Sequence, residues 1–330
     1  MSKIQWTEKT WNPIVGCRRV SPGCENCYAE KQVHRGMAPQ HKGLTVVGKG
    51  GKGPRWNGAY NVAEKRLDEP LRRKVPTRWF VNSLSDLFFE PLPFELIAAL
   101  FGVMAAAPQH TFQVLTKRPE RALEFFRWYE GTSGAGAHAY AAIVEGHDRI
   151  VPPGDRTSNV ARAFDAARRD PPPWPLPNVW LGVSVEDQAT ADERIPKLLE
   201  LPAAVRWVSY EPALGPVDFD PWMSLGRPCS AEHPCSVCAG GGEACDRLDW
   251  IVVGGESGPG ARPFDLAWAR SVVRDCATTG VPVFVKQLGA RPVVRMTARY
   301  PQLPAKLVDR KGGDPSEWPA DLRVREELDR

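Results

Sequence analysis

The sequence has no hydrophobic run long enough to span a bilayer. Its most apolar stretch, residues 94–108, is shorter than the roughly 20 residues that a transmembrane helix needs, and Glu95 interrupts it. The first ten residues, MSKIQWTEKT, contain no apolar core of the kind that a signal peptide has. We therefore expect a cytoplasmic protein with no membrane partner, in which thiols stay reduced.

Histidine is scarce, and the six histidines form neither an H-x-H nor an H-E-x-x-H pair. This argues against a metal-dependent hydrolase, an alternative that activity with zinc and without a reductant would support. The glycine-rich stretch GGESGPGARP (254–263) lacks both the G-x-G-x-x-G spacing of a dinucleotide site and the Gly-Lys-Ser/Thr of a P-loop. A ligand contact and a tight turn both remain open for it.

Neither sign of charge dominates the 330 residues, whose formal net charge is +4. Such a balance permits a nucleic acid as a partner without requiring one. The length is sufficient for one large domain with insertions or for two smaller domains.

Short β-rich runs alternate with helical stretches along the chain. The β-rich runs are residues 78–84, 111–117, 178–186, 205–212, 249–256 and 281–289. The helical stretches are residues 94–108, 188–201 and 265–280. In the last of these, Leu266, Ala269, Val273 and Cys276 line one stripe, so we predict that Cys276 is part of the core.

This alternation predicts an α/β fold with a parallel sheet and right-handed crossovers. Residues 11–15 are expected to supply a further strand, which makes a partial (βα) barrel of about six to seven strands the preferred architecture. We expect residues 1–290 to form this barrel, with insertions at 129–176 and 216–247. Residues 291–330 are expected to be a tail that packs on it.

Every predicted strand ends in polar side chains. In parallel α/β folds the chemistry lies beyond the carboxyl ends of the strands, although some of these residues will be helix caps. The candidates for catalysis are Glu186, Glu211 and Lys286. The candidates for binding a cofactor are Asp86, Lys117 and Glu256.

Three cysteines lie close together near the N-terminus, in WNPIVGCRRVSPGCENCYAE (11–30). Cys17, Cys24 and Cys27 have the spacing C-x6-C-x2-C, and a helix is expected to follow them. A structural zinc site needs four ligands, and no histidine lies within this group. Three thiolates suit a 4Fe–4S cluster whose fourth iron stays open, which is typical of a catalytic site.

Four more cysteines lie in the second insertion. Cys229, Cys235, Cys238 and Cys245 have the spacing C-x5-C-x2-C-x6-C. They suit a closed zinc site, in which His233 could replace one sulfur, and a second 4Fe–4S cluster or thiols without a metal are the alternatives. The insertion is short and rich in glycine, so a metal would have to hold it together.

The three-cysteine loop at the start of a partial (βα) barrel resembles the radical S-adenosylmethionine enzymes, whose usual spacing is C-x3-C-x2-C. That resemblance implies that the three thiolates bind a 4Fe–4S cluster and that its open iron chelates S-adenosylmethionine. It also implies that an electron donor reduces the cluster. More closely, the chain resembles the phage-associated three-Cys-motif proteins, a family of unknown function. The shared stretches include SLSDLFFE, FQVLTKRPER, RWVSYEPALGPV and KGGDPSEWPADLRVRE.

The sequence therefore predicts an iron–sulfur enzyme that generates a 5′-deoxyadenosyl radical from S-adenosylmethionine. Its expected substrate is a small molecule or nucleotide, with a nucleobase or nucleotide of phage DNA modification as the hypothesis. For a phage-encoded protein the location would be the host cytoplasm. The alternative is a zinc-containing, nucleic-acid-binding phage protein without radical chemistry. In that protein both cysteine groups would be structural, and the basic residues 41–55 would contact phosphates.

Overall fold

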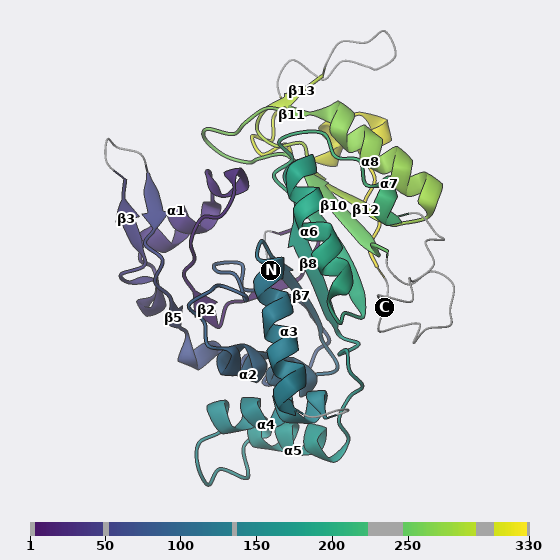
Figure 1. Ribbon diagram of the computed structural model, residues 1–330. Helices are drawn as coiled ribbons and strands as arrows, with labels where there is room; N and C mark the ends of the chain where they lie inside the picture. Colours follow the sequence, from purple (N-terminus) through teal and green to yellow (C-terminus); the bar gives the residue numbers. More distant parts are fainter. Residues whose placement is uncertain (1–3, 49–52, 134–136, 224–246, 295–306, 329–330) are drawn as a thin grey trace. The chain divides into compact units, whose positions relative to one another are not determined.

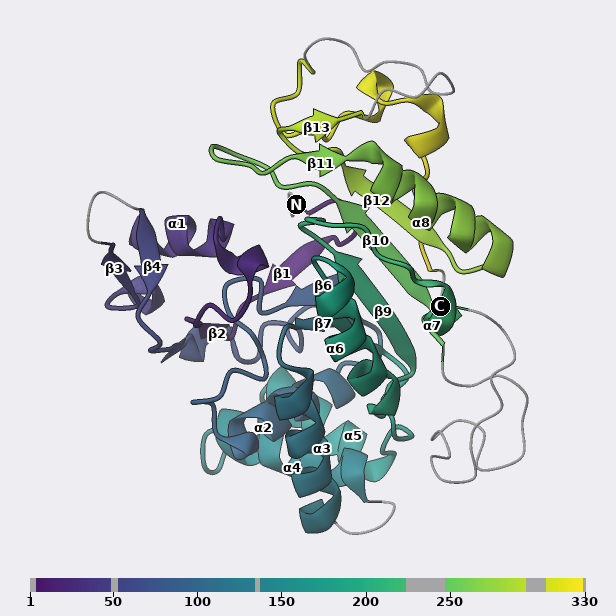
Figure 2. The same cartoon turned by 45° about the horizontal axis from the view of Figure 1, so that its top comes forward.

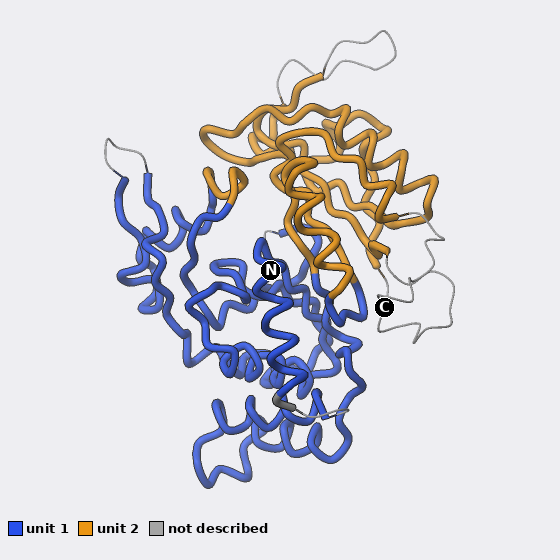
Figure 3. The backbone as a smooth tube through the Cα atoms, viewed as in Figure 1, with its two compact units in different colours: residues 1–20, 27–181, 201–205 blue, residues 21–26, 182–200, 206–330 orange. Residues whose placement is uncertain are grey.

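The computed structural model describes residues 4–48, 53–133, 137–223, 247–294 and 307–328. The chain divides into two compact units, shown in Figure 3. Unit 1 comprises residues 1–20, 27–181 and 201–205, and unit 2 comprises residues 21–26, 182–200 and 206–330. The first cysteine group is divided between them, because Cys17 and Cys27 belong to unit 1 and Cys24 to unit 2.

Seven strands form the main sheet. Their order is β1 (Lys9–Trp11), β6 (Arg78–Val81), β7 (Thr111–Thr116), β8 (Val179–Ser184), β9 (Val205–Tyr210), β10 (Trp250–Gly254) and β12 (Val283–Gln287). The recorded pairings within this sheet are parallel. The order follows the chain without a reversal, which is the winding of a (βα) barrel and not of a doubly wound sheet. The predicted α/β class and the number of parallel strands are confirmed.

Each of the six β-rich runs contains one strand of the sheet, and a further strand does come from the region before Cys17, although its bounds differ from the predicted residues 11–15. The sheet strand there is β1, which ends at Trp11, and β2 (Ile14–Val15) pairs antiparallel with β5 (Asn61–Val62) instead. Pro13 lies between the two strands. Because proline has no N–H group to donate, it ends the first ladder.

Unit 1 contains the helices α1 (Tyr28–His34), α2 (Phe94–Ala105), α3 (Pro119–Ser133), α4 (His138–Ile150) and α5 (Asn159–Arg169). Figure 1 shows α4 beside α2 and α5 beside α4, and both helices lie within the first predicted insertion. The α2 and α4 backbones come very close, since a Cβ on Gly102 would lie 2.0 Å from the carbonyl oxygen of Ala142. This packing explains why α2 is apolar nearly all round.

Unit 2 contains the helices α6 (Gln188–Glu200), α7 (Asp220–Met223) and α8 (Leu266–Thr279). Helix α8 begins at the N-cap Asp265, packs against β10 and β12, and ends at Gly280 with a φ of 70° (Figure 2). Cys276 is buried in the core, as predicted. Val272 is the buried neighbour in that stripe; Val273, which we predicted there, is only partly buried.

The remaining elements are short. They are β3 (Thr45–Val47), β4 (Pro54–Trp56), β11 (Phe264–Asp265), β13 (Pro292–Val293) and the 3₁₀ helices Pro22–Cys24, Pro39–His41, Glu64–Arg66, Pro315–Glu317 and Ala320–Leu322. Near the C-terminus, Arg325 forms an antiparallel bridge with Phe284 of β12, and Trp318 is buried. Among the described helices, none has both the length and the apolar character needed to cross a membrane.

Candidate functional site

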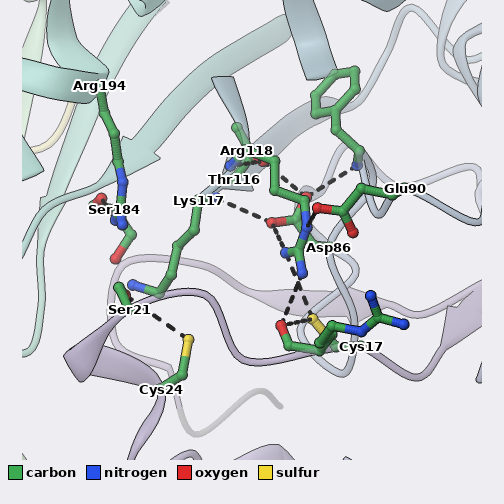
Figure 4. A network of polar contacts seen from close by, with 12 residues as sticks. Cys17, Ser21, Cys24, Asp86, Glu90, Thr116, Lys117, Arg118, Ser184 and Arg194 are labelled. Carbon is green, nitrogen blue, oxygen red and sulfur yellow. Dashed lines mark hydrogen bonds and ion pairs between the residues drawn. The ribbon is translucent and has the colours of Figure 1, made fainter. Parts of the chain in front are cut away.

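Cys17 lies directly beside a buried arginine of unit 1. Nη1 of Arg118 donates to the Cys17 sulfur over 3.7 Å (Figure 4). Gly16 has a φ of 115°, and a Cβ there would lie 2.3 Å from the carbonyl oxygen of Ala59. A glycine at this position therefore lets the chain turn and brings Cys17 next to the end of β7.

Asp86 holds Arg118 in this position. Its carboxylate accepts hydrogen bonds from the Thr116 hydroxyl at 2.8 Å, the Lys117 N–H at 3.0 Å and Nη1 of Arg118 at 3.1 Å (Figure 4). Nε of Arg118 also donates to Glu90 at 2.8 Å. Asp86 and Lys117, two of the predicted cofactor-binding residues, thus share one network after β6 and β7.

This network gives the Cys17 thiol an unusual electrostatic setting. Burial raises the pKa of Cys17 to about 12, and the positive charge of Arg118 opposes that rise. Cys27 also acts on Cys17, because the two sulfurs repel each other as thiolates. Cys27 stands at the N-cap of α1 and packs against an apolar cluster that includes Val15 and Val33. Unit 1 therefore places one of the three predicted cluster ligands, Cys17, against a guanidinium.

The Cys24 loop of unit 2 is attached to the end of β8. The Ser21 hydroxyl donates to Oε1 of Glu186 at 2.8 Å, and Nη1 of Arg194 donates to Oε2 at 3.2 Å. Glu186 has no exposed surface. The loop lies so close that a Cβ on Gly23 would stand 2.3 Å from Oε1 of Glu186. Because only glycine fits there, Glu186 and Gly23 together determine how the loop is seated.

The far side of the same loop is attached to the end of β10. Nδ2 of Asn26 donates to Glu256 at 2.9 Å and to the Gly260 carbonyl at 3.0 Å. The Arg262 N–H donates to the same carboxylate at 2.8 Å, and its Nη1 donates to the Pro22 carbonyl at 2.9 Å. Burial alone would raise the pKa of Glu256, but the bonds from Arg262 and Asn26 lower it below its ordinary value. The glycine-rich stretch 254–263 therefore holds the cysteine loop.

Glu211 and Lys286 form an ion pair across the middle strand of unit 2. Nζ of Lys286 lies 3.0 Å from Oε1 of Glu211, and the side chains are 20% and 12% exposed. Glu211 follows β9 and Lys286 lies on β12, with β10 between them. Gly254 of β10 leaves room for the pair, since a Cβ there would approach Glu211 to 2.7 Å. Among the described residues this pair forms no hydrogen bond or ion pair with residues 21–26 of the cysteine loop, and it stays partly accessible to solvent.

Cys17, Cys24 and Cys27 have the donor atoms that an iron–sulfur cluster needs, but the structure does not group them as metal ligands. Thiolates are the usual ligands of such clusters, and hydrogen bonds to their sulfurs tune the redox potential, as the Arg118 contact would. In the described part of the chain, no three His, Cys, Asp or Glu side chains are grouped in a way that could hold a metal ion. Cys229, Cys235, Cys238 and Cys245 lie outside the described residues.

The structure brings the predicted site residues together in three groups. Asp86 and Lys117 lie in unit 1, Glu186 and Glu256 hold the cysteine loop of unit 2, and Glu211 pairs with Lys286. Sequence reasoning did not single out the residues that support them. These are Ser21, Arg194 and Arg262. No sequence motif marks these three residues, because the supporting role of each depends on a contact that only the folded chain forms.

The fold and this arrangement define an α/β protein whose cysteine segment is fastened to polar strand ends. Residues 1–312 match the family model of DUF5131, described as a protein of unknown function. The chain belongs to this family. No match was found among curated proteins or among solved structures.

Proposed function

We propose that this protein is an iron–sulfur enzyme that uses S-adenosylmethionine for radical chemistry on a nucleobase or nucleotide. As parts of this proposal, the protein is similar to radical S-adenosylmethionine enzymes, it is related to the phage three-Cys-motif proteins, and it is located in the cytoplasm. The observation that carries it is the fastening of the cysteine segment. In unit 1, Cys17 accepts a hydrogen bond from the guanidinium of Arg118, which follows β7. In unit 2, the loop that carries Cys24 is bonded to the carboxylates that follow β8 and β10.

Cys17, Cys24 and Cys27 are the proposed ligands of a 4Fe–4S cluster. When reduced, such a cluster supplies the electron that cleaves S-adenosylmethionine into methionine and a 5′-deoxyadenosyl radical. The residues of the chain then have two kinds of task. Asp86 and Arg118 fix the Cys17 sulfur, while Glu186 and Glu256 fix the loop that carries Cys24. We therefore assign Glu186 and Glu256 to positioning, although the sequence favoured catalysis and cofactor binding for them.

The Glu211–Lys286 pair is the proposed substrate-facing group. It lies at the carboxyl end of the sheet in unit 2, where α/β enzymes carry their chemistry, and it is more exposed than Glu186. An ammonium and a carboxylate 3.0 Å apart can share a proton or bind a polar substrate group. Because no hydrogen bond or ion pair joins Glu211 or Lys286 to the cysteine loop in the described part of the chain, the two side chains can exchange partners without disturbing that loop.

The test is anaerobic reconstitution with iron and sulfide, followed by S-adenosylmethionine and dithionite. We expect 5′-deoxyadenosine from the wild type and from Cys276→Ala, which removes a core thiol outside the proposed site. A variant with Cys17, Cys24 and Cys27 all changed to serine should form none. Intact cluster absorbance without 5′-deoxyadenosine would remove the radical mechanism. Bound zinc without cluster absorbance would favour the alternative, a nucleic-acid-binding protein.

A further inference from the structure

One aromatic side chain of unit 1 is exposed and yet fixed in place. Tyr28, the first residue of α1, is 53% exposed, more than any other tyrosine, tryptophan or phenylalanine in the described part of the chain. Its hydroxyl donates to the Ser83 carbonyl, just after β6, at 2.7 Å. The Ser83 hydroxyl in turn donates at 3.1 Å to Asn12, which is buried. The tyrosine ring is therefore held at both ends while much of its surface faces solvent.

This arrangement reverses the usual placement of a surface tyrosine. Such a residue normally packs its ring on apolar surface and turns its hydroxyl to water. In Tyr28 the hydroxyl has a backbone partner, whereas the ring forgoes the burial that would stabilise the fold. A ring that is both fixed and exposed is suited to stacking against a flat partner, because little side-chain freedom is lost on binding.

Two cations lie on the same side of α1 as this ring. Lys31 and Arg35 follow Tyr28 by three and seven residues, so the three side chains share one stripe of the helix, which we call the α1 stripe. Arg35 is the C-cap residue and keeps a helical backbone. Both cations are exposed, and neither forms an ion pair with any residue that the structure describes. The opposite side of the helix is buried and consists of Ala29, Glu30 and Val33.

We propose that the α1 stripe binds single-stranded nucleic acid, with one base stacked on Tyr28 and backbone phosphates at Lys31 and Arg35. Sites for single strands combine cations that follow the backbone with aromatic rings on which the bases stack. Lys31 and Arg35 are separated by about 6 Å along the helix axis, so they can contact phosphates at two levels of one strand. The stripe therefore offers both kinds of contact that a single strand uses.

Other ligands use only part of this stripe. Each base of a duplex is already stacked on its neighbours, so no base face is free for Tyr28 until the duplex is opened. An acidic peptide can pair with Lys31 and Arg35, but it leaves the ring unused. Cationic ligands also bind aromatic rings, but the two cations of the stripe would repel them. A mononucleotide can stack on the ring, but it carries no second phosphate group along a strand.

The α1 stripe begins directly after Cys27, one of the three proposed cluster ligands. Because the Tyr28 hydroxyl is tied to the segment that follows β6, the stacked base would lie at the carboxyl end of the sheet in unit 1. The inference therefore names the substrate class of the proposed enzyme as a nucleobase within a single strand. That assignment rests on the proposed function, whereas the binding itself does not.

The test measures the anisotropy of a fluorescent single-stranded DNA of about 12 nucleotides, within the usual range of site sizes. It runs at several salt concentrations without S-adenosylmethionine or reductant. Tyr28→Ala should lose about fivefold or more in affinity with an unchanged salt slope, because it removes a stacking ring and no charge. K31Q/R35Q should make the salt slope shallower by about 0.7 per lost phosphate contact.

Matched controls for both changes come from unit 1. Tyr140→Ala removes the other exposed tyrosine, which is 45% exposed, and R162Q/R169Q removes two exposed cations of α5. Both controls should bind as the wild type does. Tyr28→Phe keeps the ring and loses only the hydroxyl, so it should retain most of the affinity, which separates stacking from a loss of folding.

Several outcomes would overturn the inference. They are equal affinity of Tyr28→Ala and the wild type, an unchanged salt slope of K31Q/R35Q, and tighter binding of the duplex of the same sequence. Competition by polyglutamate as strong as that by the unlabelled strand would also overturn it, and equally strong competition by a mononucleotide would assign the stripe to free nucleotides instead. Because this assay needs no cluster, it can fail while 5′-deoxyadenosine still forms, and it can succeed when none forms.

Discussion

At the scale of single residues, the cysteine loop depends on a close contact between Gly23 and Glu186. A Cβ at position 23 would stand 2.3 Å from the Glu186 carboxylate, which is buried and bonded to Ser21 and Arg194. The carboxylate cannot retreat without breaking these bonds. Position 23 must therefore be a glycine for the loop to pack against Glu186.

We predict that Gly23→Ala destabilises the protein by about 1–3 kcal/mol, the usual cost of overpacking a filled space. Urea denaturation measures this change, and the iron bound after reconstitution should fall with it. Gly131→Ala is the matched control, because a Cβ there meets open space in helix α3 and alanine favours helix. Unchanged stability of Gly23→Ala would show that the loop is not seated on Glu186.

Glu256 gives a prediction about pH. Its pKa is lowered in the folded protein, mainly because the bonds from Arg262 and Asn26 outweigh the effect of burial. A lowered pKa contributes stability above the ordinary value of 4.5 and loses it as the pH falls through the folded value. We expect the wild type to be more stable than Glu256→Gln near neutral pH, with the difference shrinking below 4.5. Unfolding of both proteins across that range measures it, and a constant difference would contradict the assignment.

At the scale of elements, three neighbouring strands create the Glu211–Lys286 pair. Neither β9 nor β12 could form it alone, and Gly254 of β10 leaves the space through which the side chains meet. The two side chains are only 20% and 12% exposed, so removing one partner would leave the charge of the other poorly compensated. A test of the pair's chemical role therefore has to separate turnover from stability.

We predict that Glu211→Gln and Lys286→Met each lower substrate turnover by about 100-fold or more, as the loss of an acid–base group does. The double variant Glu211→Gln/Lys286→Met leaves neither charge unpaired, so it should lose less thermal stability than the two single variants together. The exposed pair of Arg149 and Glu64 in unit 1 provides the control, since Arg149→Met and Glu64→Gln should leave turnover intact. A large loss of stability with unchanged turnover per folded molecule would show that the first pair is structural.

The elements themselves were largely predictable. The six strands and the helices α2, α6 and α8 follow from hydrophobic periodicity and from clear stops such as Gly280. The first strand was misplaced, since apolar residues continue past Pro13 although the ladder cannot. The β3–β4 hairpin was not anticipated, because its strands are short and exposed and so lack an apolar face.

At the scale of the whole molecule, the two cysteine groups are expected to act independently. The first is bonded to strand ends, and the second lies outside the described residues, more than 200 positions further along the sequence. We predict that changing Cys229, Cys235, Cys238 and Cys245 to serine removes one zinc, or the iron of a second cluster, and leaves the first cluster in place. Metal analysis of the purified chain measures both. Loss of 5′-deoxyadenosine with the first cluster intact would show that the groups cooperate.

The sequence by itself determined the α/β class, the strand-end candidates and the three clustered thiols, because periodicity and spacing are local properties of a chain. Only the tertiary structure decided which partners each candidate contacts. Glu186 and Glu256 hold a loop that lies more than 150 residues away in sequence, while Glu211 and Lys286 meet across an intervening strand. Such partners are chosen by strand order and burial, and residue spacing does not contain that information.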